Sequence, residues 1–195
     1  FRFGHILIRD AAYDSMPKET RAELHERFAR WLEEAAAQRM GEYEEIVAHH
    51  LEQAFSLRTA LGPLDSDARE LAHAAARHLS SAATRAANRG DVAATAELYE
   101  RAIELLRAVD DSWLQLASAY TDALWEAGRM PEAELFVTEA HERAQGTVDE
   151  RTRTAIELSL MTVRMSMDPD SLDLADFRSS IDRAVEVFSA AGDDV

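Results

Sequence analysis

The 195-residue chain contains no cysteine, and this excludes a disulfide scaffold, a thiolate zinc site and a cysteine nucleophile. Lys18 is the single lysine, so no glycine-rich phosphate loop ending in Lys-Ser/Thr is present. No apolar run approaches the ~18 residues that a membrane-spanning helix requires. No basic-then-apolar leader follows Phe1 either, and we therefore expect a cytoplasmic location.

The charge of the chain is strongly negative. It carries 37 acidic and 21 basic residues, for a net charge of −16, and residues 91–195 hold 23 of the acidic groups but only 9 of the basic ones. An acidic surface repels both phosphate backbones and anionic lipid. We therefore expect no direct contact with nucleic acid and no membrane partner.

Apolar residues recur at helical spacing along most of the chain. Only 7 glycines and 4 prolines are present, and most of them lie between periodic segments. Helical spacing predicts helices over 17–38, 148–166 and 172–191, and further helices around the apolar stripes at 43–55, 71–86, 96–106, 113–124 and 135–140. Phe1 and Phe3 fit the end of a β-strand, but no strand pattern follows residue 10. The predicted fold class is all-α.

A repeat of two helices is the most informative feature of the sequence. Gly90 and Gly128 lie 38 residues apart at equivalent turns, and Ala102 and Ala140 each follow 12 residues after one of these glycines. A small residue at such a position lets two helices approach closely. A two-helix period near this length is typical of helical solenoids, so we expect an α–α superhelix.

The repeated residues resemble the tetratricopeptide repeat. The positions that carry the resemblance are Gly90-Asp91-Val92, Ala96, Leu98-Tyr99 and Ala102-Ile103, then Gly128, Ala133, Phe136 and Ala140. Thr95 stands where that family usually has alanine, Ala83 stands where it has glycine, and the spacing of 38 exceeds its usual period. The resemblance implies about three degenerate tetratricopeptide-like helix pairs over residues 61–195.

The N-terminal third resembles the segment that follows the nucleotide-binding module in bacterial signal-transducing ATPases of the AAA/STAND type. The resemblance rests on the stretches 3–13, 24–29, 49–54 and 61–65. It implies that residues 1–60 are the helical tail of a winged-helix-like region and a linker. It also implies a regulatory, protein-binding segment of a larger ATPase linked to an adenylate/guanylate cyclase. A helix-turn-helix transcriptional regulator as the parent and a free-standing helical adaptor remain alternatives.

The sequence predicts no catalytic, cofactor or metal site in this segment. His49, His50 and Glu52 are close in sequence, but adjacent histidines point about 100° apart on a helix. His73 and His78 are five apart, whereas two ligands on one helical face are four apart. The serines that could pair with a histidine are Ser15, Ser80 and Ser81, and none lies in a nucleophile-elbow motif.

The first helices of stacked pairs line the concave face, where partner segments bind. By the repeat register, the residues predicted on this face are Arg77, Ser80, Thr84, Asn88, Gln115, Ser118, Asp122 and Trp125. Arg77 and Asn88 are suited to hold a peptide backbone or carboxylate. Trp125 offers an aromatic anchor or, alternatively, packs between repeats. The expected partner is a protein or peptide, including other domains of the same polypeptide.

Overall fold

A computed structural model describes residues 6–146, 148–168 and 174–192 of the chain. In these ranges the backbone forms α-helices and two 3-10 helices, and no strand is present. The elements are α1 (Ile6–Asp14), α2 (Lys18–Ala35), η1 (Ala37–Glu42), α3 (Glu44–Thr59), α4 (Ser66–Asn88), α5 (Val92–Arg107), η2 (Asp111–Leu116), α6 (Ala117–Glu126), α7 (Met130–Ala144), α8 (Glu150–Met167) and α9 (Leu174–Ala191). The predicted strand at Phe1 and Phe3 lies outside the described residues.

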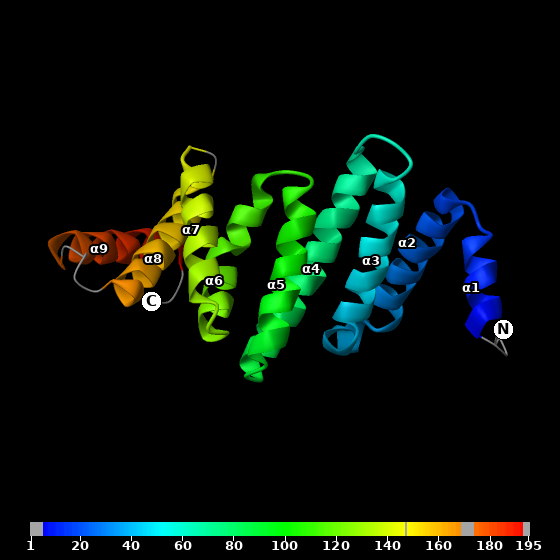
Figure 1. Cartoon of the computed structure of the whole chain (residues 1–195), viewed down its shortest axis with the longest axis horizontal. Helices are drawn as coiled ribbons and strands as arrows, with labels where there is room; N and C mark the ends of the chain where they lie inside the picture. Colours follow the sequence, from blue (N-terminus) through cyan, green and yellow to red (C-terminus); the bar gives the residue numbers. More distant parts are fainter. Residues whose placement is uncertain (1–5, 147, 169–173, 193–195) are drawn as a thin grey trace.

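The helices follow one another along the long axis of the molecule, from α1 at one end to α9 at the other (Figure 1). Helices α2 and α3, α4 and α5, α6 and α7, and α8 and α9 follow one another in sequence, and each of these pairs packs together. α3 also packs on α4, and α7 packs on α8, so the pairs form a continuous stack. This arrangement confirms the predicted all-α superhelix of tetratricopeptide-like helix pairs.

The two predicted turns have the same backbone structure. Gly90 and Gly128 have φ angles of 73° and 72°, a left-handed conformation that a Cβ atom disfavours. The amides of Asp91 and Arg129 each donate to the carbonyl five residues earlier, over 2.9 Å in both cases. These are Schellman turns, which end α4 and α6. The left-handed conformation at both turns explains why glycine recurs at this position after 38 residues.

Small side chains dominate the helix contacts. Ala102 and Ala140, which the repeat placed at close approaches, are both fully buried, at 0% exposure. The buried residues of α4 are mostly alanines, interrupted by Leu71 and Leu79. Alanine brings helix backbones close together and retains high helix propensity, so the stack is held by dense packing of small side chains.

Two predicted helices differ in detail from the structure. The helix expected over 113–124 is instead η2 followed by α6. The Asp110 side chain accepts from the Ser112 amide at 2.9 Å and caps the start of η2. Within η2, Trp113 and Leu114 are both buried. The helix expected over 17–38 ends at Ala35, because Ala36 leaves helical geometry with a φ of −108° and the chain continues as η1.

Candidate functional site

A groove of about 960 Å³ lies between α2, α4 and η2. These elements come from three successive parts of the stack, so no single helix pair forms the groove. Leucine side chains of α3, α4, α5 and η2 contribute to the apolar part of its lining. Leu51, Leu71 and Leu106 are almost fully buried, and Leu116 is half-buried. Polar and charged side chains of α2, α4 and η2 complete the lining. A cavity that combines an apolar lining with a few polar groups is typical of a binding site.

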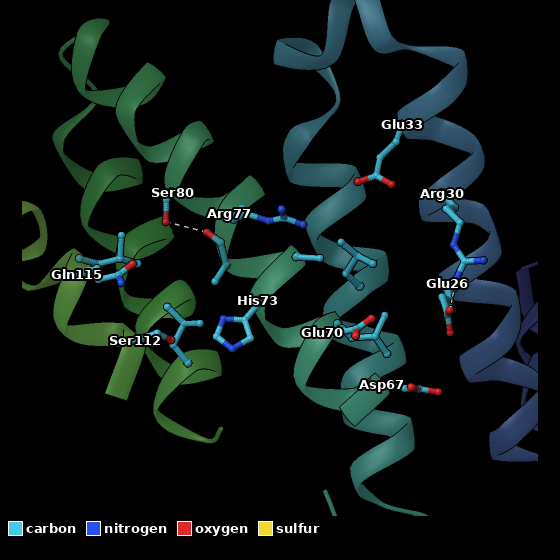
Figure 2. A pocket seen from close by; sticks show the side chains of 16 residues that line it. Glu26, Arg30, Glu33, Asp67, Glu70, His73, Arg77, Ser80, Ser112 and Gln115 are labelled. Carbon is cyan, nitrogen blue, oxygen red and sulfur yellow. Dashed lines mark hydrogen bonds and ion pairs between the residues drawn. The ribbon is translucent and has the colours of Figure 1, made fainter. Parts of the chain in front are cut away.

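Helix α4 contributes most of the polar lining because its residues recur every three or four positions on one face. Asp67, Glu70, His73, Arg77 and Ser80 follow this spacing, and all of them line the groove. Figure 2 shows the first four of these residues placed successively along the helix. The face therefore changes from acidic residues at the start of α4 to an arginine two turns further on.

Helix α2 forms the opposite wall with Glu26, Arg30 and Glu33 (Figure 2). Ion pairs connect this wall with the neighbouring helices. Glu26 pairs with Arg30 on α2 and accepts from Arg58 Nη2 at 2.7 Å. Glu33 Oε1 lies 2.8 Å from His78 Nε2 of α4, so this contact joins the two walls of the groove directly.

The groove brings together three of the eight residues predicted on the concave face, namely Arg77, Ser80 and Gln115. Thr84 and Asn88 continue the same face of α4, and both are exposed beyond the groove. The Thr84 hydroxyl donates to the Ser80 carbonyl at 3.0 Å and lies 3.3 Å from the Tyr99 hydroxyl. These two residues are therefore accessible but do not line the cavity.

The remaining predicted residues lie on α6. Ser118 Oγ is 2.6 Å from Ser159 Oγ of α8, so this side chain takes part in a contact between repeats. Trp125 is half-buried and packs against the main core, which leaves only part of its indole accessible. The Asp122 carboxylate reaches solvent, but desolvation by the surrounding helices and the nearby charge of Glu126 raise its pKa.

Sequence reasoning missed several lining residues. Asp67, Glu70 and His73 lie on the predicted face of α4, and continuing the three- and four-residue steps back from Arg77 would have found them. The α2 residues carried no comparable signal. The contact between Glu33 and His78 spans 45 residues of sequence, and it depends on how α2 and α4 sit in the stack.

Histidines form a separate cluster at the N-terminal end of the stack. His25 Nδ1 of α2 and His50 Nδ1 of α3 are 2.8 Å apart, and the Tyr13 hydroxyl of α1 lies 2.8 Å from His25 Nε2. Burial lowers the pKa of His25 to about 4, with smaller effects from His50, His49 and Arg21. Burial, and then the charge of His49, also lowers the pKa of His50. These histidines pack as neutral rings that join three helices.

The serines considered as nucleophiles bond to partners other than histidine. Ser15 Oγ donates to the Ala12 carbonyl, Ser80 Oγ to the Ala76 carbonyl, and Ser81 Oγ to the Glu44 carboxylate. In the part of the chain that the structure describes, no group of three or more histidine, aspartate or glutamate side chains is arranged to hold a metal ion. No described helix combines the length and apolarity needed to cross a membrane.

Comparisons with known proteins found similarity among solved structures. No protein-family model matches the chain, and no curated protein matches its sequence. The chain is similar to a crystal structure of nearly identical TPR-like repeats, from a Podosopora anserina protein described as a kinesin light chain. The TM-score is 0.44 and the sequence identity 14%, over 91% of this chain and 98% of that one.

Proposed function

We propose that this chain is a protein-interaction segment whose groove between α2, α4 and η2 binds a segment of a partner protein. The supporting observation is the groove itself, with its volume of about 960 Å³ and its combination of leucines with polar side chains. A partner's apolar side chains would contact the leucines, and its backbone and polar groups would contact Arg77, Ser80 and Gln115.

We further propose that the segment belongs to a cytoplasmic bacterial signalling ATPase linked to a nucleotide cyclase. The support is the resemblance of the stretches 3–13 and 24–29 to such ATPases, together with the repeats that follow. In this role the groove docks a partner or a domain of its own polypeptide, and binding shifts an equilibrium between inactive and active states. A helix-turn-helix regulator as the parent and a free-standing adaptor are the alternatives.

A peptide selection tests whether the groove binds protein segments. A library of displayed peptides is selected on the intact chain, and enriched sequences are then measured against two tryptophan variants. Ser80→Trp places an indole in the groove, whereas Ala93→Trp places one at an exposed site of α5 outside it. We expect ~10-fold or greater weakening by Ser80→Trp and little change with Ala93→Trp. Equal binding to both variants would refute the proposal.

The parent polypeptide is tested separately, by sequencing the gene on both sides of the region that encodes this chain. A glycine-rich phosphate loop encoded upstream supports the signalling ATPase, and a neighbouring α/β domain with paired metal-binding aspartates supports the cyclase link. A short basic helix pair at one end would instead favour the transcriptional regulator. A gene that encodes only this chain would favour the adaptor.

A further inference from the structure

The charged groups that line the groove differ in whether they already have partners. Glu26 pairs with Arg30 and Arg58, and Glu33 contacts His78. Among the described residues, no cation lies within ion-pair distance of Asp67 or Glu70, and no carboxylate lies within that distance of Arg77. The lining charges without an ion pair are therefore the carboxylates of Asp67 and Glu70 and the guanidinium of Arg77. The Asp67 carboxylate also accepts from Ser66 Oγ at 3.3 Å, and its charge helps to raise the pKa of Arg58.

The position of Glu70 argues against a purely structural role for its charge. Acidic residues in the first turn of a helix stabilise it through the helix dipole, and Asp67 lies in the first turn of α4. Glu70 lies beyond that turn, where the dipole effect has faded. It also has no lysine or arginine three or four residues away on α4 with which to pair. Its carboxylate therefore contributes negative charge to the groove without a compensating contact.

Helix α6 carries a further carboxylate, that of Asp122, outside the lining of the groove. Asp122 is on the face predicted to be concave, and within the described ranges no cation lies at ion-pair distance from it. Desolvation and the charge of Glu126 raise its pKa, as expected for a carboxylate without a cationic partner. A bound cation would lower the cost of keeping such groups ionised.

We infer that the groove binds a cationic amphipathic segment, in which lysine or arginine residues face Asp67 and Glu70 while leucine-like residues contact Ala74 and Leu116, the partly exposed apolar residues of the lining. This inference rests on the proposed function and specifies the partner. Glu70 and Arg77 are seven residues apart, or ~10 Å along α4, so the basic groups of the segment lie toward the start of α4, away from Arg77. Complementary charge of this kind would also speed the encounter of the partner with the acidic chain.

Three synthetic peptides with one apolar pattern test the inference. Their polar positions are all lysine, all glutamine or all glutamate, and binding to the intact chain is measured by fluorescence anisotropy. We expect the lysine peptide to bind most tightly. Asp67→Asn with Glu70→Gln should weaken it ~5-fold or more.

The net charge of −16 attracts any cationic peptide, so a matched control is needed. Glu97→Gln with Glu104→Gln removes two exposed carboxylates of α5 outside the groove, and this pair should change the affinity less than 2-fold. Equal weakening by the two double variants would overturn the inference, because the attraction would then come from the overall charge.

The outcomes also separate this inference from the proposed function. If the glutamine or glutamate peptide binds best, and Ser80→Trp weakens that binding, the groove binds protein segments but the cationic preference is wrong. Ser80→Trp can also leave the binding of all three peptides unchanged, and the display selection can yield no peptide whose binding it weakens. In that case both the proposed function and the cationic preference are wrong. Binding of the lysine peptide that is sensitive to Ser80→Trp and to the Asp67/Glu70 variant supports both.

Discussion

The contact between His25 and His50 predicts that mild acid destabilises the N-terminal end of the stack. At least one of the two facing Nδ1 atoms must accept a hydrogen bond over the 2.8 Å between them, so the contact requires an unprotonated ring. The pKa of His25 is lowered from 6.5 to about 4 in the folded chain. Between these values the unfolded chain binds more protons, so stability is complete above pH 6.5 and falls as the pH decreases toward 4.

The magnitude follows from the two pKa values. Complete protonation would cost ~3 kcal/mol, and lowering the pH from 7.5 to 5.0 would cost ~2 kcal/mol. His25 is only partly buried, and solvent screening reduces this to ~1 kcal/mol. For a chain of this length, that energy corresponds to a decrease in melting temperature of ~2–4 °C. The lowered pKa of His50 acts in the same direction.

Thermal unfolding followed by circular dichroism at pH 7.5 and 5.0 measures the effect. This range stays above the ordinary pKa values of aspartate and glutamate, so histidines dominate the change. We compare the wild type with His25→Gln, and with His73→Gln as a control that removes a histidine from α4. The difference in melting temperature between the two pH values should shrink in His25→Gln and persist in His73→Gln. An unchanged difference in His25→Gln would refute the reasoning.

Two further predictions concern the repeat itself, and both are measured by thermal or urea unfolding. Gly90→Ala should destabilise the chain by ~1 kcal/mol. The cause is the φ of 73° alone, since no atom lies within 4 Å of the added Cβ. Gly62 has equal space and no positive φ, so Gly62→Ala should be neutral or slightly stabilising. Ala102→Leu should cost ~1–3 kcal/mol by overpacking a fully buried contact, whereas Ala93→Leu on the exposed face of α5 should cost little. Equal stabilities within either pair would contradict the packing described here.

The repeat was predictable because its constraints are local. A left-handed turn requires glycine, and a close helix contact requires alanine, so Gly90, Gly128, Ala102 and Ala140 mark the pairs in the sequence. The break between η2 and α6 was not predictable in this way. The rings of Trp113 and Phe136 pack together with centroids 5.8 Å apart, and this contact crosses from η2 to α7. Helical periodicity carries no information about such a contact.

The candidate site was predictable only where it follows a single helix. Stepping along α4 from Arg77 reaches Ser80 in one direction and Glu70 in the other, because all three share one face. The opposite wall depends on the placement of α2, and no periodicity within α4 reveals it. A prediction from one repeat at a time therefore finds only part of a groove that successive helix pairs form together.

The groove crosses the boundary at residue 60 that the sequence proposes between an N-terminal tail and the repeats. Glu26, Arg30 and Glu33 come from the N-terminal side of that boundary, and Glu33 contacts His78 on the other side. The N-terminal core also crosses the boundary, since Ala29 of α2 and Leu51 of α3 pack in one cluster with Leu71 of α4. A chain starting at residue 61 would keep the repeats but lose one wall of the groove. The binding unit that we propose therefore requires α2 and α3 as much as the repeats that follow them.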